Sequence, residues 1–103
     1  MNVHALKTEA IYWELANNRT KTFEVRQDDR QPRFETGDVV VLVNQGEGKK
    51  GQRIVFRIGY LLRDYPIPGY VVFQLDPSTD DDDDVVAAVA VGDIAVSVPQ
   101  VSR

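Results

Sequence analysis

The sequence predicts an α+β fold in which one short helix near the N-terminus is followed by a small antiparallel sheet. Three observations predict it. Residues 9–16 carry apolar side chains four positions apart, as one face of a helix requires, and residues 22–26 and 53–63 alternate polar with apolar side chains, as strands do. The chain has 103 residues, 43% of them hydrophobic, which suffices for one domain with a single core.

The predicted helix follows a short extended segment, residues 3–7, and is expected to begin with a cap from the Thr8 side chain. Asn17 and Asn18 are expected to end it. Four apolar residues on adjacent turns would form the stripe that packs on the sheet: Ile11, Tyr12, Leu15 and Ala16.

The first strand after the helix, residues 22–26, has two unlike faces. Phe23 and Val25 are expected to face the core. Glu24 and Arg26 are expected on the opposite face, together with Thr22, where they would meet solvent or a ligand.

Three further strands are predicted in the central part of the chain. Residues 39–43 are an unbroken apolar run, typical of a strand covered on both sides. Residues 53–63 alternate, with Gly59 as a candidate bulge, and residues 70–75 return after a proline-rich turn. The side chains of the long strand that are expected to face inward are Ile54, Phe56, Ile58 and Tyr60.

The C-terminal quarter of the chain differs in composition from the domain that precedes it, residues 1–75. Residues 76–84 predict an acidic linker, because the five consecutive aspartates from Asp80 onward repel one another and resist burial. Residues 85–103 form an apolar extension, which we expect to add a strand to the sheet. A homodimer contact through residues 85–98 is the alternative, since exposed apolar edges favour self-association.

The composition excludes several kinds of site. The chain has no Cys and one His, so disulfides, thiolate metal sites and Cys nucleophiles are excluded, and neither a metal nor a cofactor is expected. The longest apolar stretch, residues 85–91, is far shorter than the ~20 residues of a membrane span, and a cytoplasmic location is expected. Residues 1–75 hold eleven Lys and Arg against nine Asp and Glu, a mildly basic balance that permits phosphate binding.

A set of short motifs runs through residues 3–75 in this order: His4-x-Leu6-Lys7, a helix that holds Trp13, Lys21-Thr22-Phe23-Glu24-Val25-Arg26, Asp29-Arg30, Phe34, Gly37-Asp38 and Gly69-Tyr70-Val71-Val72. In these motifs the chain resembles the ASCH-type domains of the PUA-like superfamily, in particular an uncharacterised bacterial and phage branch that opens with His-x-Leu-Lys. The resemblance implies a small mixed β-barrel with the helix packed beside it. It also implies a cleft between helix and barrel that binds RNA, nucleotides or nucleoside derivatives.

The candidate binding site lies on the charged face of residues 21–26. Strand periodicity places Glu24 and Arg26 on one face, with Lys21 at the start of the strand. Glu24 can accept from an exocyclic amine of a base, while Lys21 or Arg26 donates to a carbonyl or a phosphate. Three more residues are expected to border the cleft and add positive charge: His4, Lys7 and Arg30. The alternative is that Glu24 only forms ion pairs on a solvated face, each contributing about 0–1 kcal/mol.

We expect a binding domain rather than an enzyme. Some relatives in the superfamily are amidohydrolases that deacetylate N4-acetylcytidine, and their Lys-Thr-x-Thr strand supplies a lysine and a threonine nucleophile helped by a distant glutamate. The matching residues here are Lys21, Thr22 and Glu24, and Glu24 stands where that nucleophile would be. An amidohydrolase with these three catalytic residues is therefore the alternative function. A protein-interaction module acting through the C-terminal extension is the second alternative.

Overall fold

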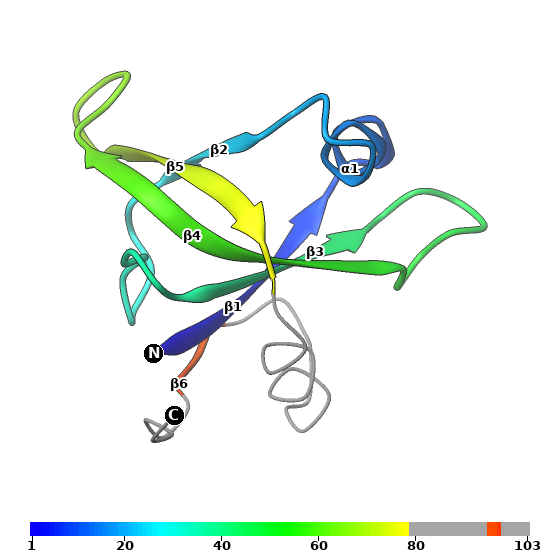
Figure 1. Cartoon of the computed structure of the whole chain (residues 1–103), viewed down its shortest axis with the longest axis horizontal. Coiled ribbons are helices and arrows are strands. Elements are labelled where there is room, and N and C mark those ends of the chain that lie inside the picture. Colours follow the sequence, from blue (N-terminus) through cyan, green and yellow to red (C-terminus); the bar gives the residue numbers. More distant parts are fainter. Residues whose placement is uncertain (79–94, 98–103) are drawn as a thin grey trace.

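The computed structural model describes residues 1–78 and 95–97, which form one sheet and one helix (Figure 1). The helix, α1, spans Ala10–Asn17. The strands are β1 (Asn2–Thr8), β2 (Phe23–Gln27), β3 (Val39–Asn44), β4 (Arg53–Arg63), β5 (Tyr70–Pro77) and β6 (Ala95–Ser97). Their order in the sheet is β2-β5-β4-β3-β1-β6.

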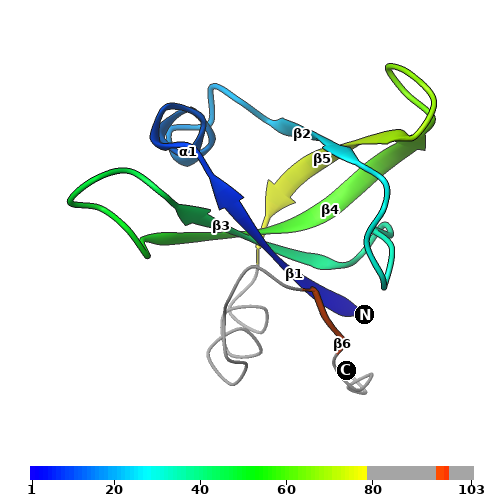
Figure 2. The ribbon, with the colours of Figure 1, turned by 180° about the vertical axis from the view of Figure 1, so that it is seen from behind.

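The sheet is mixed, as expected for the small mixed barrel predicted above, although the alternating segments by themselves predicted an antiparallel sheet. β1 runs parallel to β3, with Val3 opposite Val39, and every other described pair of strands is antiparallel. The parallel pair is possible because α1 and β2 lie between these strands in the chain and supply the long connection that parallel strands need. The sheet curls, and α1 lies at its open side (Figures 1 and 2). This curled mixed sheet with one short helix is a small barrel-like α+β fold.

The buried strand β3 lies at the centre of the core. Residues 39–42 are fully buried, as their unbroken apolar run predicts. Alternate side chains of β3 enter the main core, which also holds Trp13 and Phe73, and a smaller cluster around Val3 on the other face of the sheet. Coverage on both faces explains why this segment shows no alternation of polarity.

The helix α1 packs on the sheet through Trp13 and Ala16. The Trp13 indole Nε1–H donates a hydrogen bond to the carbonyl oxygen of Leu42 at 2.9 Å, which sets the rotation of the helix. The predicted stripe is therefore partly wrong, because this rotation leaves Ile11 64% exposed and Tyr12 49% exposed.

Thr8 ends β1 and does not cap the helix, which corrects the sequence prediction. Its hydroxyl donates to the carbonyl oxygen of Leu6 at 3.2 Å, and the residue before the helix, Glu9, makes no side-chain capping bond. β1 continues to Thr8 because Thr8 pairs with Asn44 in the parallel register. Sheet pairing thus uses the residue that the local pattern assigned to the helix cap.

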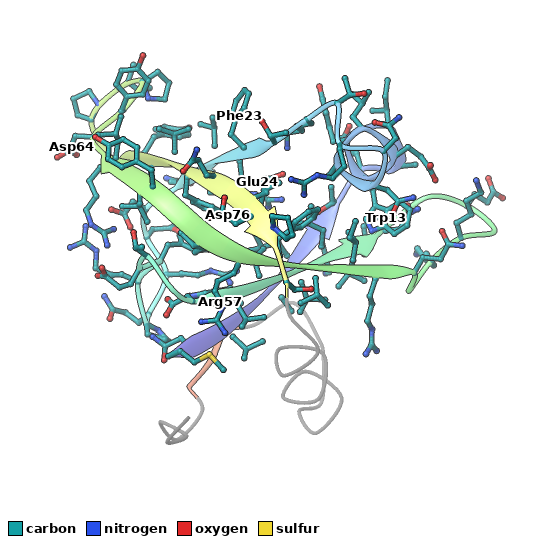
Figure 3. The ribbon with its side chains drawn as sticks, viewed as in Figure 1. Trp13, Phe23, Glu24, Arg57, Asp64 and Asp76 are labelled. Carbon is teal, nitrogen blue, oxygen red and sulfur yellow. The ribbon has the colours of Figure 1, made fainter. Side chains whose placement is uncertain are left out.

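The two faces of β2 are reversed relative to the prediction. Phe23 is 50% exposed and Val25 is 40% exposed, whereas Glu24 is only 3% exposed. Figure 3 shows Phe23 and Glu24 on opposite sides of the strand, with Glu24 on the side of Trp13. The register explains the reversal: Glu24 lies opposite the buried Phe73 of β5, and directly opposed residues share one face of a sheet.

A bulge interrupts the long strand β4. The register to β5 shifts between Ile58 and Leu61, around the predicted position Gly59. Phe56 and Ile58 are buried as predicted, but the extra residue turns Tyr60 outward, where it is 65% exposed. Leu61 packs against the main core instead.

The C-terminal extension contributes one described strand. Ala95–Ser97 pairs antiparallel with β1. The acidic linker and the dimer contact fall mainly on residues 79–94 and 98–103, which lie outside the described residues. Within the described residues, no helix is long and apolar enough to cross a membrane.

Asp28 anchors the loop between β2 and β3. Its carboxylate accepts hydrogen bonds from Arg33 at 2.6 Å and from Arg63 at 3.1 Å. Arg63 also donates to the carbonyl oxygen of Phe34 and to the Glu35 carboxylate. The loop is therefore held to the end of β4 by charge-assisted bonds rather than by backbone pairing.

The indole hydrogen bond can be tested by substitution. Trp13→Phe should lower the free energy of unfolding by about 1–3 kcal/mol, because it removes the donor to Leu42 and part of a buried ring. Ile11→Ala on the exposed side of α1 should change it by less than about 0.5 kcal/mol. Urea denaturation measures both, and equal losses in the two variants would contradict the packing described for α1.

The Asp28 cluster predicts a dependence of stability on acid. The pKa of Asp28 is lowered, first by the hydrogen bond from Arg33; burial of the carboxylate opposes this effect, and the hydrogen bond and charge of Arg63 lower the pKa further. A group with a lowered folded-state pKa stabilises above its unfolded pKa of about 3.9, and this contribution is lost as the pH falls through the folded pKa. Asp28→Asn should cost about 1–3 kcal/mol at neutral pH.

Between about pH 4 and pH 2, the Asp28→Asn variant should lose less stability than the native chain, because it no longer has this carboxylate to protonate. Urea denaturation at a series of pH values measures the difference. Asp29→Asn, which changes the exposed neighbouring carboxylate, is the matched control and should follow the native profile. Parallel profiles for Asp28→Asn and the native chain would rule out the proposed anchor.

Candidate functional site

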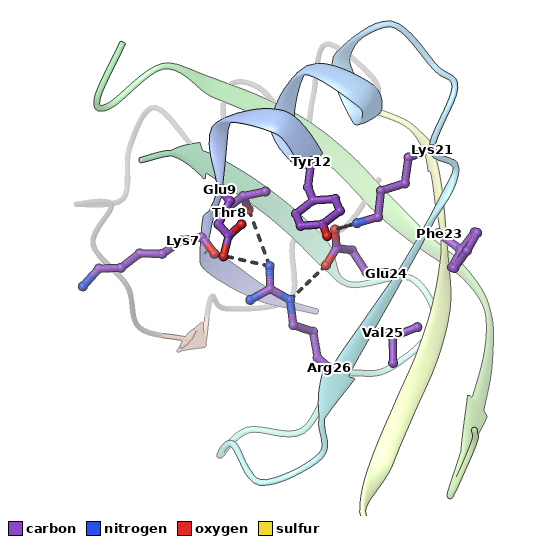
Figure 4. A pocket seen from close by; sticks show the side chains of 9 residues that line it. All are labelled: Lys7, Thr8, Glu9, Tyr12, Lys21, Phe23, Glu24, Val25 and Arg26. Carbon is purple, nitrogen blue, oxygen red and sulfur yellow. Dashed lines mark hydrogen bonds and ion pairs between the residues drawn. The ribbon is translucent and has the colours of Figure 1, made fainter. Parts of the chain in front are cut away.

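Three charged side chains converge on the inner face of β2 (Figure 4). The Glu24 carboxylate is buried and accepts from two cations, Lys21 Nζ on Oε1 and Arg26 Nε on Oε2 at 2.9 Å. The side chains of Lys21 and Arg26 are themselves partly exposed. The cluster therefore places a desolvated carboxylate behind two cations that reach solvent.

The turn from α1 into β2 fixes Lys21. The backbone N–H of Lys21 donates to the carbonyl oxygen of Leu15 at 2.9 Å, which ties the turn to the end of the helix. Arg19 takes a left-handed conformation (φ 68°) that reverses the chain there. Thr20 is held by a backbone bond to the Asn18 side chain at 3.0 Å. These contacts bring Lys21 to the start of β2, three residues before Glu24.

Arg26 connects β2 to β1, two strands that are not neighbours in the described sheet. Its Nη2 donates to the carbonyl oxygen of Lys7 at 3.3 Å and to Thr8 Oγ1 at 3.5 Å, while Nε holds Glu24. One guanidinium thus joins the edge strand β2 to the end of β1. Arginine suits this position because its planar group carries five N–H donors in a fixed arrangement.

The charged cluster forms one wall of a cavity of about 420 Å³, called the first cavity. Its apolar and aromatic walls are Tyr12, Phe23 and Val25. Its polar lining is Lys7, Thr8, Glu9, Lys21, Glu24 and Arg26. The lining carries three cations against two carboxylates, so it offers hydrogen-bond donors, acceptors, aromatic surface and a small excess of positive charge.

Aromatic residues at the rim add a second kind of contact. Tyr12 and Phe23 are each about half exposed, and Lys21 Nζ lies 5.7 Å from the centroid of the Tyr12 ring. A planar ligand can stack on such rings while its edge meets the charged wall. The rotation of α1 and the register of β2, which turned these residues away from the core, also made them available to the cavity.

The predicted site residues are distributed over three places. Lys21, Glu24 and Arg26 lie together in the first cavity. Lys7 belongs to its lining, but Figure 4 shows its side chain extending away from the cluster. Arg30 lies in a second cavity of about 260 Å³, which shares Arg26 with the first. Thr22, one of the three catalytic residues of the amidohydrolase alternative, is exposed and is not part of the described lining.

His4 was expected to border the cleft, but it does not. It is fully buried, its Nε2 lies 2.8 Å from Asp38 Oδ2, and its ring is 4.6 Å from that of Phe34. Nδ1 has no hydrogen-bond partner among the described residues. The loop before β3 covers β1 around His4. Asp38 holds this loop in place, because its carboxylate also accepts hydrogen bonds from the backbone N–H groups of Asn2 and Glu35, at 3.0 Å each. His4 therefore pins the start of β1 to that loop.

Sequence reasoning missed five residues of the first cavity. It assigns Thr8 to the helix cap, Phe23 and Val25 to the core, Tyr12 to the stripe of the helix that packs on the sheet, and Glu9 only to the helix. For Thr8, the two-residue period from His4 through Leu6 was the available signal, because it places all three on one face of β1. Among residues 1–78 and 95–97, no three His, Asp or Glu side chains come together in a way that could hold a metal ion.

Comparison with known families identifies the domain. A family model described as a domain of unknown function (DUF3850) matches residues 3–75. The chain belongs to this family. The match runs from β1 into β5 and includes every residue of both cavities of this DUF3850 domain. No curated protein matches the chain.

The burial of Glu24 makes its ion pairs a test of the site. Glu24→Ala should lower the free energy of unfolding by about 1–3 kcal/mol, because it leaves Lys21 and Arg26 close together without their shared partner. The exposed pair of Glu14 and Lys49, 3.7 Å apart, provides the control. Glu14→Ala should change stability by less than about 0.5 kcal/mol.

Urea denaturation at low and high salt measures both variants. The loss in Glu24→Ala should persist at high salt, since salt screens buried pairs weakly. A Glu24→Ala variant as stable as Glu14→Ala would show that the buried pairs contribute no more than ordinary surface pairs.

Proposed function

We propose that this DUF3850 domain binds RNA or a nucleotide- or nucleoside-like ligand in the first cavity, with Lys21, Glu24 and Arg26 as its contacts. The observation that carries the proposal is the buried Glu24 carboxylate, held between two partly exposed cations beside half-exposed aromatic rings. The likeness of residues 3–75 to ASCH-type domains of the PUA-like superfamily points to the same class of ligand.

The chemistry of a nucleobase suits this lining. Each carboxylate oxygen of Glu24 holds one cation and keeps a second lone pair, which can accept from an exocyclic amine. Lys21 and Arg26 can donate to a ring carbonyl or to phosphate. Stacking on Tyr12 or Phe23 would add about 1–3 kcal/mol per base, as in proteins that bind single strands.

Hydrolysis of a modified nucleoside such as N4-acetylcytidine has less support. Glu24 stands at the position of the threonine nucleophile, and Thr22, two residues before it, is exposed and outside the described lining. The Thr8 hydroxyl is buried and already bonded to Leu6 and Arg26. An interaction module through the C-terminal extension would depend mainly on residues outside the described part of the chain.

Titration calorimetry with short single-stranded RNA and a panel of nucleotides tests the proposal. Lys21→Ala and Arg26→Ala should each weaken binding by about tenfold or more, because each removes a charge-assisted hydrogen bond. Binding should also weaken as salt rises. Lys50→Ala and Arg53→Ala, on the exposed connection between β3 and β4 and at the start of β4, are matched controls that should change affinity by less than about twofold.

Circular dichroism of each variant separates loss of binding from loss of folding. Affinity that is equal in the native chain, Lys21→Ala and Arg26→Ala would remove the proposal. Release of acetate from N4-acetylcytidine by the native chain would favour the hydrolytic alternative.

A further inference from the structure

A second cavity lies beside the first and shares one residue with it. This second cavity, of about 260 Å³, is lined by Leu6, Arg26, Gln27, Asp29, Arg30 and Phe34. Arg26 also lines the first cavity, so its guanidinium stands between the two. A ligand with two chemically different parts could therefore occupy both cavities, with one part on each side of Arg26.

Arg26 has donors left for a ligand. Its Nε is bonded to Glu24 and its Nη2 to β1, but Nη1 makes no hydrogen bond within the described part of the chain. The bonds already made hold the guanidinium in place, so an anion that approaches Nη1 meets a preorganised donor. Such preorganisation reduces the entropy lost on binding.

Arg30 faces the second cavity from the loop after β2. Its Cζ lies 5.2 Å from the centroid of the Phe34 ring, the distance of a cation–π contact. Phe34 is buried between the rings of His4, at 4.6 Å, and Phe73, at 4.9 Å, so the surface under Arg30 is rigid. A guanidinium in a cation–π contact keeps its N–H donors in its own plane, and such donors can bind a phosphate.

The charge of the second cavity favours an anion. Two arginines face one carboxylate, that of Asp29, which is exposed. Arginine pairs recognise phosphate better than lysine does, because two N–H groups can bind two oxygens at once. Arg26, which lines both cavities, therefore presents positive charge to each of them.

We propose that the second cavity is a phosphate subsite, in which Arg26 and Arg30 bind the phosphate of a nucleotide whose base lies in the first cavity. The inference rests on the proposed function of the first cavity. It names the ligand class as a nucleoside phosphate, either free or as a unit of single-stranded RNA, and not as an unphosphorylated nucleoside.

Calorimetry and NMR on the full chain test the phosphate subsite. The probes are cytidine, uridine, adenosine and guanosine, the 5′- and 3′-monophosphates of each, and inorganic phosphate alone. For the base that binds, one of the two monophosphates should bind about tenfold or more tightly than the nucleoside. The side-chain Nε–Hε signal of Arg30 should shift with that nucleotide and not with the nucleoside.

Substitutions at Arg30 locate the gain. Arg30→Met keeps an unbranched side chain over Phe34 and should remove the advantage of the nucleotide, while nucleoside affinity changes by less than about twofold. Arg30→Lys should keep part of the advantage as a point charge without the paired donors. Arg53→Ala is the control, because Arg53 lines neither of the two described cavities. This variant should leave the affinities for nucleoside and nucleotide unchanged.

The outcomes separate this inference from the function on which it depends. Nucleosides that bind through Lys21, with no gain from phosphate and no effect of Arg30→Met, would overturn the phosphate subsite and leave the proposed function standing. Failure of every nucleoside, every nucleotide and the short single-stranded RNA to bind would overturn both. If Arg30→Met does not fold, the comparison of nucleoside with nucleotide on the native chain, with the Arg30 signal, still decides.

A short single-stranded RNA, with and without a 5′-phosphate, distinguishes the two sources of the phosphate. Tight binding of both forms that is weakened by Arg30→Met supports an internal phosphate of RNA. Binding that needs the terminal phosphate supports a free nucleotide or an RNA end. An RNA affinity that is the same in the native chain and in Arg30→Met would count against the subsite.

Discussion

The antiparallel pairing of β2 with β5 is the constraint on which the candidate site depends. Glu24 lies opposite Phe73, and Phe73 belongs to the main core, so the carboxylate must face the interior as well. A slip of one residue would bring Phe23 inside and turn Glu24 out to solvent. The buried carboxylate is tolerated because Lys21 and Arg26 bind both of its oxygens. Without them its desolvation would be far more costly.

Arg26 joins two strands across the opening of the curled sheet, whereas neighbouring strands elsewhere in the sheet are joined by backbone hydrogen bonds. In the described sheet β2 is an end strand and β1 is near the other end, and the Arg26 side chain spans between them to Lys7 and Thr8. A side chain fixes the distance between two strands without filling the space beside it. That space remains as two cavities, and Arg26 forms a wall of each.

The parts of the chain around the second cavity are irregular in backbone but firmly held. Asp28 ties the loop after β2 to Arg63, and the buried pair of His4 and Asp38 ties the start of β1 to the end of the same loop. Phe34 lies between these anchors. A loop held in this way can present Arg30 with little loss of entropy, as expected of binding residues carried by loops on a rigid scaffold.

The sequence by itself determined the helix, the strands of the domain, the bulge near Gly59 and the proximity of Lys21, Glu24 and Arg26, because each follows from local periodicity or from spacing within a few residues. Only the tertiary structure decided which face of each element is buried. The rotation of α1 follows from the hydrogen bond of the Trp13 indole to Leu42, and the side of β2 that faces inward follows from its register with β5. The burial of His4 follows from its contact with Asp38, 34 residues away. These partners are distant in the chain, and alternation of polarity reports that two faces differ without reporting which one meets the core.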